Sequence, residues 1–359
     1  MAAFSSASST STRCDPRLIS RQRLAAVSQS TISSSTMPTL ADLAKRMDPD
    51  GNISKVIEMM AQNNQVLDMM PWSECNDGTN HKTTVRNGLP TPVWRQLNYG
   101  VPSAKSSTTK VQDATGMLEI YAKIDKSLAD LNNNSAAWRL SEEAPFREAM
   151  NQTLASTLFY GDTTSNPERF MGLAPRFADS TAENGRNIIK GGGAGSDNTS
   201  IWLVGWGENT AHGLYPKGSQ AGLQVRDLGE DTASDGAGGE YQILRTHYKW
   251  DCGFTVRDWR FIVRICNIDV SDLTKNASAG ADLIDLLAQA LETIESLDGV
   301  RPALYGNRTI ASFLRRQIVN KVASSTLTQG EVAGRRVMMV GEVPFYRTDA
   351  ILSTEATVA

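Results

Sequence analysis

Two short patterns in the chain match the triplets of serine acyl-enzymes such as β-lactamases. Ser107 stands three residues before Lys110, and Ser196 begins a Ser-Asp-Asn triplet. In such enzymes the serine of the first pattern is the nucleophile. The Lys-Thr-Gly triplet that completes the set is absent, and Ser107 lies in a polar loop rather than at a helix start. A serine acyl-enzyme built on Ser107, Lys110 and Ser196 is therefore kept only as a remote alternative.

Residues of the types that can bind metals are few and scattered along the chain. His81 lies in a polar extended segment, His212 in a loop and His247 in a strand, and none has a second His or a Cys at ligand spacing. The segment DPDGN (48–52) resembles a calcium loop, but its Gly comes too early and Met59 replaces the closing Glu. The cysteines are far apart and form no CxxC pair: Cys14, Cys75, Cys252 and Cys266. We expect neither a metal nor a cofactor.

Composition limits the possible partners. The net charge is -3 and the pI about 5.8, which argues against strong binding of nucleic acid through its phosphates. The chain has no run of 18 apolar residues, so we expect no membrane partner. Hydrophobic residues make up 40% of the chain, enough for a large core.

The first 36 residues differ from the rest of the chain. They contain 15 Ser or Thr, four Arg, no Lys and a single acid, Asp15. This composition is typical of an organellar transit peptide, and it equally fits a non-native extension upstream of a start at Met37. We expect residues 1–36 to be disordered in either case.

The apolar periodicity predicts an α+β fold without an internal repeat. Helices are expected at 54–69, 141–162, 281–295 and 308–322, and strands at 200–207, 302–307 and within 335–352 around Gly341–Glu342. Glu142 and Glu143 would occupy the first turn of the second helix, and Gly161 would end it. Residues 238–269 would form two strands joined near Asp251–Gly253.

A long hairpin is predicted from two extended arms, 81–90 and 108–126. Its tip is rich in Pro, Ser and Thr, so it has too few apolar residues to fold on itself. It nevertheless carries Trp94 and Tyr99, which a linker would not need. Because no catalytic cluster is apparent, we interpret the chain as an assembly unit whose arm finds its apolar partner on another subunit.

Several stretches together resemble the major capsid proteins of tailed bacteriophages, which have the Hong Kong ninety-seven type fold. The sequence is most similar to the capsid proteins of short-tailed phages of the epsilon-fifteen kind, and the resemblance covers residues 37–359. It is carried by MPTLADLAKRMDPDG (37–51), TTVRNGLPTPVWRQLNYGV (83–101), DATGMLEIYAKIDKSLADLN (113–132), FYGD and PERFMGLAPRF (within 159–177), THYKWDCGFTVRDWRFIVRICNIDVS (246–271) and NRTIASFLRRQI (307–318).

The resemblance implies a division of the chain into functional parts. These are a disordered extension (1–36), an N-terminal arm (37–78), an extended hairpin loop (79–122), a peripheral domain with a long spine helix (123–175), an insertion or peripheral elaboration (176–245), peripheral-domain strands (246–275), an axial domain (276–345) and a return to the peripheral domain (346–359).

The resemblance also implies a function that is structural rather than enzymatic. The chain would assemble with itself into hexamers and pentamers of an icosahedral head that encloses double-stranded DNA, contacted non-specifically. Scaffolding and portal proteins would be further partners, with cement proteins left open, and assembly would occur in the host cytoplasm. An encapsulin-like compartment, which shares the fold but holds a cargo enzyme, stays open as an alternative.

The hairpin tip supplies the implied inter-subunit contacts. These residues are Trp94, Arg95, Tyr99, Lys105 and Lys110, with the cations expected to pair with acids on the neighbour. The alternative is that Trp94, which is flanked by Val93 and Leu97 in the sequence, packs on its own subunit.

Overall fold

The computed structural model describes residues 62, 64–131, 135–234, 238–274, 280–320, 327–332 and 335–358. All of them belong to one compact unit, Lys55–Ala359. The extension 1–36, most of the expected arm 37–78 and most of the expected helix 54–69 lie outside the described residues, which begin this region with α3 (Val66–Met69).

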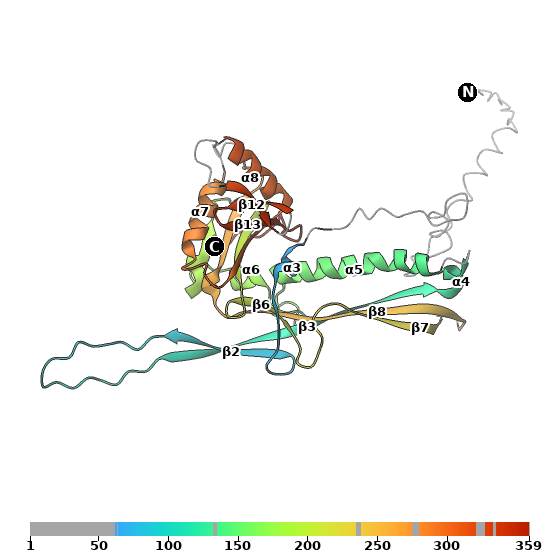
Figure 1. The fold of residues 1–359 in the computed structure, drawn as a ribbon, viewed down its shortest axis with the longest axis horizontal. Helices are drawn as coiled ribbons and strands as arrows, with labels where there is room; N and C mark the ends of the chain where they lie inside the picture. Colours follow the sequence, from blue (N-terminus) through green and yellow to red (C-terminus); the bar gives the residue numbers. More distant parts are fainter. Residues whose placement is uncertain are drawn as a thin grey trace, which may run out of the picture. The chain divides into compact units, whose positions relative to one another are not determined.

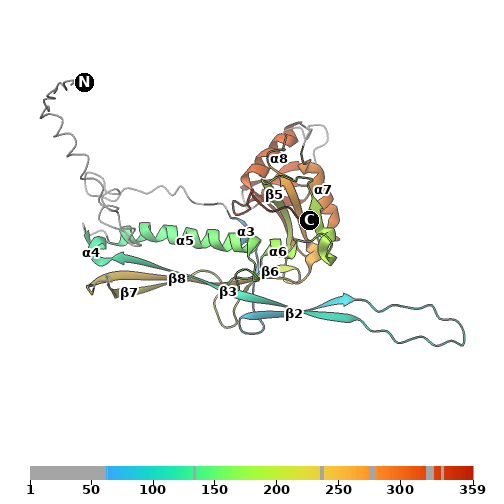
Figure 2. The same ribbon diagram turned by 180° about the vertical axis from the view of Figure 1, so that it is seen from behind.

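The described residues form a mixed α and β structure (Figures 1 and 2). Its helices are α3, α4 (Lys126–Ala129), α5 (Ser135–Tyr160), α6 (Leu173–Arg176), α7 (Leu283–Thr293) and α8 (Arg308–Asn320), with short 3-10 turns η2 (Glu183–Asn187) and η3 (Trp259–Phe261). Its strands are β1 (Trp72–Glu74), β2 (Asn80–Gly88), β3 (Ser107–Asp125), β4 (Ile188–Lys190), β5 (Asn198–Trp206), β6 (Ala211–Tyr215), β7 (Gln224–Ser234), β8 (Glu240–Val256), β9 (Ile262–Asp269), β10 (Arg301–Gly306), β11 (Leu327–Val332), β12 (Arg335–Val340) and β13 (Val343–Arg347).

The strands join into one sheet in the order β11-β12-β13-β10-β5-β6-β8-β3-β2, with β1, β4, β7 and β9 attached to it. Strand β5 is buried along its whole length because the sheet is covered on both faces there. Its side chains alternate: Ile201 and Leu203 join one hydrophobic cluster, while Trp202 and Val204 join the other. The strand therefore separates two cores.

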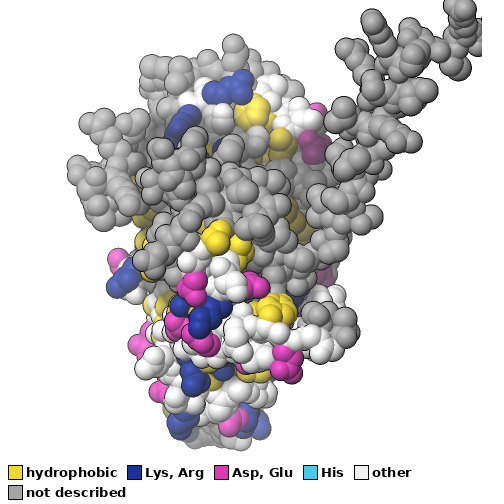
Figure 3. All heavy atoms as spheres, turned by 90° about the vertical axis from the view of Figure 1, so that its right-hand side faces the viewer, with side chains coloured by type: hydrophobic (Ala, Val, Ile, Leu, Met, Phe, Trp, Pro, Cys, Tyr) yellow, Lys and Arg dark blue, Asp and Glu magenta, His cyan; other side chains and the backbone are white. Residues whose placement is uncertain are grey.

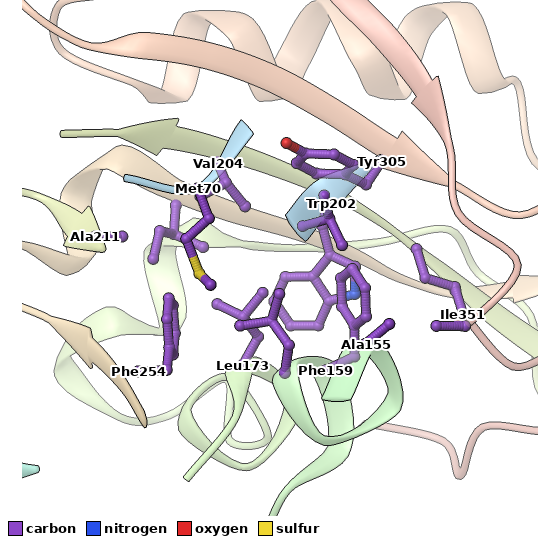
Figure 4. Packing of buried hydrophobic residues seen from close by; sticks show 14 of the residues in the cluster. Met70, Ala155, Phe159, Leu173, Trp202, Val204, Ala211, Phe254, Tyr305 and Ile351 are labelled. Carbon is purple, nitrogen blue, oxygen red and sulfur yellow. The ribbon is translucent and has the colours of Figure 1, made fainter. Parts of the chain in front are cut away.

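The first core lies between β5 and the end of α5 (Figure 4). Phe159 and Phe177 pack against the Trp202 ring at centroid distances of 6.3 and 6.0 Å. The buried indole of Trp206 donates a 2.8 Å hydrogen bond to the Tyr305 hydroxyl, which satisfies a polar group that would otherwise be costly to bury. The second core is built by α7 and α8 against the opposite face of β5, β9 and β10.

Helix α5 runs alongside β3 and β8 (Figures 1 and 2) and buries Met150 against Ala122 and Tyr248. No helix among the described residues is long and apolar enough to cross a membrane.

A buried ion pair attaches the C-terminal segment to the first core. The Arg264 guanidinium donates to Glu355 at 2.7 Å, and each side chain is only 4% exposed. The Tyr160 hydroxyl donates to the other Glu355 oxygen at 2.5 Å, and Ser200 also donates to this carboxylate. The hydrogen bonds around the pair offset the cost of removing both charges from water.

Much of the expected secondary structure is confirmed, including the hairpin, the end of the long helix at Gly161, the helices at α7 and α8, and the two strands around Gly341. Two expectations for the long helix are wrong. Helix α5 begins at Ser135, so Glu142 and Glu143 lie inside it rather than in its first turn. Glu143 instead accepts hydrogen bonds from Thr246 and Tyr248 of β8.

Two expectations for the strands are also wrong. Asp251–Gly253 is not a turn, because β8 continues through it to Val256 and the chain turns at 257–261. A Cβ at Gly253 would lie 2.9 Å from the Thr115 side chain, so glycine serves close strand approach here. His212 lies in strand β6 rather than in a loop, paired with Thr255 of β8.

We expect Glu355→Gln to lower the free energy of unfolding of the unassembled subunit by about 3–5 kcal/mol, because Arg264 would stay buried without a counter-charge. Denaturant titration measures this. The matched control is Glu230→Gln, which removes an exposed ion pair with Lys126 and should change stability little. Equal effects of the two substitutions would contradict this assignment.

Candidate assembly interface

Strand β3 connects the hairpin to the sheet, because it belongs to both. Residues Thr115–Asp125 of β3 pair with β8, and residues 107–114 pair with β2. The β2–β3 ladder ends at the Gly88–Ser107 pair, which follows a register shift between Arg86 and Gly88. Beyond it the two arms run unpaired to the tip (Figure 1). The tip is thus positioned by the core but is not packed against it.

Large hydrophobic side chains are exposed at the tip. Of the thirteen exposed large hydrophobic residues in the described part of the chain, six lie within 89–101: Leu89, Val93, Trp94, Leu97, Tyr99 and Val101. Trp94 is 100% exposed, and Leu97 is 90% exposed. Because monomers seldom leave so many apolar groups together in water, this concentration indicates a surface that another molecule covers.

A short turn organises the tip. The Tyr99 amide donates to the Gln96 carbonyl at 3.3 Å, and Asn98 has a positive φ of 70°, which Asn tolerates better than most residues. The Arg95 Nε donates to the Tyr99 carbonyl at 3.0 Å. These contacts hold Trp94 and Tyr99 on one short, locally ordered loop.

The hairpin is also basic. Residues 78–112 contain five Lys or Arg and no Asp or Glu, so 31 of the 36 cations and all 39 acids lie elsewhere in the chain. Lys82 pairs with Asp77 at the base of the hairpin. Arg86, Arg95, Lys105 and Lys110 have no carboxylate partner among the described residues. The arm therefore suits an acidic surface, which the rest of this chain has the charge to supply.

The structure brings all five predicted contact residues to this one arm, with Trp94, Arg95, Tyr99 and Lys105 in the tip and Lys110 on β3. The alternative, in which Trp94 packs on its own subunit, is wrong, because the Trp94 side chain is fully exposed.

The residues of the serine acyl-enzyme alternative are not brought together. Ser107 starts β3 beside Gly88, whereas Ser196 lies in the loop before β5. No hydrogen bond joins Ser196 to Ser107 or Lys110 in the part of the chain that the structure describes. Burial raises the pKa of the Cys75 thiol to about 11 and that of Cys252 to about 12, so both are poor nucleophiles.

A polar cluster that the sequence did not indicate lies at the root of the hairpin. Asp113 of β3 accepts from Arg176 at 2.6 Å and from Thr255 of β8 at 2.6 Å. Beside it, the buried rings of His81 and His212 meet edge to face, with centroids 5.9 Å apart. Their positions in the sequence carry no hint of this contact, because it arises from the pairing of strands distant in the chain.

The environment of the two histidines favours their neutral forms. The pKa of His212 is lowered to about 4, first by burial and then by the nearby charge of Arg257. The pKa of His81 is lowered for the same two reasons. No group of three or more His, Cys, Asp or Glu residues within the described ranges is arranged to hold a metal ion.

Charges of both signs are mixed on one face of the subunit. On the face shown in Figure 3, Lys and Arg side chains lie interspersed with Asp and Glu side chains over the coloured, described part of the surface.

Residues 48–359 match the family model of the major capsid protein GP7. The chain belongs to this capsid protein family. A structure of bacteriophage Epsilon15 is similar at 38% identity and a TM-score of 0.74, covering 91% of this chain and 99% of that one. The family match includes the hairpin and both cores, and the resemblance inferred from the sequence is confirmed.

Two further structures share much less with this capsid protein. The bacteriophage JBD30 capsid is 9% identical with a TM-score of 0.46, covering 94% of this chain and 99% of that one. An encapsulin complex from Synechococcus elongatus is 12% identical with a TM-score of 0.42, covering 64% and 96%. Neither similarity is strong enough to support an argument. No curated protein matches the chain.

This protein is the major capsid protein of a tailed phage, so it forms oligomeric capsid shells and resides in the virion capsid. The Hong Kong ninety-seven type fold expected from the sequence is likewise confirmed.

We expect the double substitution Trp94→Ala with Tyr99→Ala to leave the unfolding free energy of the unassembled capsid protein within about 0.5 kcal/mol, because both rings are exposed. Denaturant titration tests this. The matched control, Trp202→Ala, removes a buried ring and should cost about 3–5 kcal/mol. A large loss in the double variant would mean that the tip packs on its own subunit.

Proposed function

We propose that the hairpin tip is a main contact between neighbouring copies in the shell, through Trp94, Arg95, Tyr99, Lys105 and Lys110. The observation that carries the proposal is the cluster of six exposed apolar side chains at the tip. Burial of aromatic rings at the centre of an interface contributes more than most other contacts. A neighbouring copy that covers the tip would supply the apolar partner that the subunit itself lacks.

The cations of the arm support the same proposal. Four of them lack a carboxylate partner in the described subunit, while the rest of the chain has an excess of acids. Opposite charges on two copies steer their encounter and fix their register, even where each exposed pair contributes little energy. The arm of one copy would thus approach an acidic region of the next.

We further propose that the copies form hexamers and pentamers of an icosahedral head around double-stranded DNA. The excess of acids outside the arm fits weak, non-specific contact with the packaged DNA, since a basic wall would bind it tightly. Scaffolding and portal proteins, with cement proteins left open, would be further partners in the host cytoplasm. The division of the chain at 36, 78, 122, 175, 245, 275 and 345 is part of this proposal.

The proposal also holds that the chain is not an enzyme. It is supported by the separation of Ser107 from Ser196 and by the protonated state of the buried thiols. Covalent labelling of Ser107 by a β-lactam would overturn this part.

We expect Trp94→Ala with Tyr99→Ala to weaken assembly while the subunit stays folded. Loss of two interface aromatics should cost about 2–4 kcal/mol at each contact, which raises the critical concentration for shells at least tenfold. Electron microscopy after size-exclusion chromatography, on protein expressed from Met37 with its scaffolding partner where one is needed, measures this. Leu140→Ala, which truncates an exposed leucine on α5, is the control. Normal shells from the double variant would contradict the proposed contact.

We expect Lys105→Gln with Lys110→Gln to reduce the salt dependence of assembly, because screening acts on exposed charge pairs. Light scattering across a salt series measures the effect. The control, Lys190→Gln, removes an exposed cation at the end of β4 and should leave the salt dependence unchanged. An unchanged slope in the double variant would show that these lysines do not meet acids on a neighbour.

A further inference from the structure

Four segments that are distant in sequence meet at the hairpin root. Strand β2 contributes His81, β3 contributes Asp113 and β6 contributes His212, while Arg257 follows β8 directly. Strand β6 is held to β8 by backbone pairing and to β1 by a short parallel ladder. Close to the root, the Cys75 amide donates to the Tyr215 carbonyl at 2.9 Å, which ties the β1–β2 connection to β6. These contacts join the hairpin root to β6 and β8.

The hydrogen bond at His81 shows which form of the ring the root requires. Arg257 Nη2 lies 2.8 Å from His81 Nε2. A guanidinium can only donate, so Nε2 must be the acceptor and the ring must be neutral. The other nitrogen, Nδ1, is buried with no hydrogen-bond partner among the described residues. A proton added at Nε2 would replace this hydrogen bond with two donors facing each other.

The charges that face the two rings would become unbalanced by protonation. Among the described residues, the charge of Arg257 opposes the protonation of both histidines, and the charge of Asp113 favours it. Asp113 already accepts from Arg176 of α6 at 2.6 Å. Two imidazolium ions would therefore join two guanidinium groups around a single carboxylate, in a site where His212 is 1% exposed. Such an arrangement is strongly unfavourable in a poorly hydrated site.

We propose that His81 and His212 form an acid-sensitive latch, which holds the root of the β2–β3 hairpin against β6 when neutral and releases it when the rings take up protons. The β2–β3 ladder does not involve this contact, so the hairpin would loosen as a unit from β6. The latch is a property of the subunit and does not depend on the proposed contacts of the tip.

The pH window follows from the direction of the shifts. An ordinary His has a pKa of 6.5, and the folded-state pKa of His212 is about 4. Below pH 6.5 the released state binds more protons than the latched state, so the latched state loses stability as the pH falls, down to about pH 4. Above pH 6.5 the latch keeps its full stability.

The labelling rate of the Cys75 thiol measures how often the hairpin root opens. The Cys75 side chain is 2% exposed and lies between β1 and β2, whereas Cys266 is buried in the core on β9 and reports on global unfolding.

The experiment labels the full-length, unassembled protein with 4,4′-dithiodipyridine, which reacts with thiols in acid, at pH 7 and at about pH 4.5. Mass spectrometry of peptides then gives the labelling rate at each cysteine, corrected by the rate of glutathione under the same conditions.

We expect the corrected rate at Cys75 to rise at least tenfold in acid, because each unit of pKa difference contributes up to a factor of ten to the opening equilibrium. Cys266 should stay protected. In His81→Gln with His212→Phe, which keep an acceptor for Arg257 and a ring on β6 without a titrating group, the rise should disappear. His247→Gln, which changes a histidine stacked on Tyr121 away from the root, should behave as the wild type does.

Three results would overturn the latch: a Cys75 rate that does not change with pH in the wild type, equal acid sensitivity in the double variant, or parallel exposure of Cys75 and Cys266. Circular dichroism at pH 7 checks that the double variant is folded. If it is not, His81→Gln alone must reduce the rise.

Discussion

Strand β3 is the element on which the arrangement of this capsid protein depends. Its nineteen residues run for about 60 Å, eleven of them paired with β8 of the sheet and eight with β2 of the hairpin. An isolated two-stranded hairpin is marginally stable in water. The arm is therefore ordered because one of its two strands is a direct continuation of a strand that the sheet and α5 already hold.

The same strand explains why polar groups are buried where they are. The ladders of β2, β6 and β8 converge at the point where β3 changes its pairing partner from β2 to β8. Backbone pairing alone leaves polar side chains of opposite charge or hydrogen-bonding role facing inward there. Asp113, Arg176 and Thr255 satisfy each other there. The Arg264–Glu355 pair plays a comparable part at the C-terminal segment. Both clusters join segments that are far apart in the chain. Their hydrogen bonds and ion pairs orient these segments with more directional specificity than a purely apolar contact would.

The subunit is well packed at its two cores, whereas apolar side chains at the tip of its arm have no packing partner within the described subunit. Helices cover both faces of β5, whereas the tip presents Trp94 and Leu97 to water. This contrast is what an assembling shell protein requires, because a contact that stabilises the shell must be absent from the free subunit. The arm also differs in charge, because residues 78–112 carry five cations and no acid, whereas Lys and Arg lie interspersed with Asp and Glu on the described surface in Figure 3.

The parts of this protein that depend on local periodicity and turn chemistry could be predicted from its sequence. The helices α7 and α8, the turn at Gly341 and the hairpin with its Pro-, Ser- and Thr-rich tip could be predicted, because each depends on residues close together in the chain. The sequence left open whether Trp94 packs on its own subunit, and the structure shows its side chain fully exposed. The tertiary structure decided the rest. Helix α5 extends back to Ser135 because Trp138 is buried and Arg139 contacts Thr246 of β8. Likewise, Gly253 continues a strand because Thr115 packs against it, and His81 meets His212 because β2 and β6 converge. Local propensity cannot report such contacts, since the groups that stabilise them come from elements brought together only by folding.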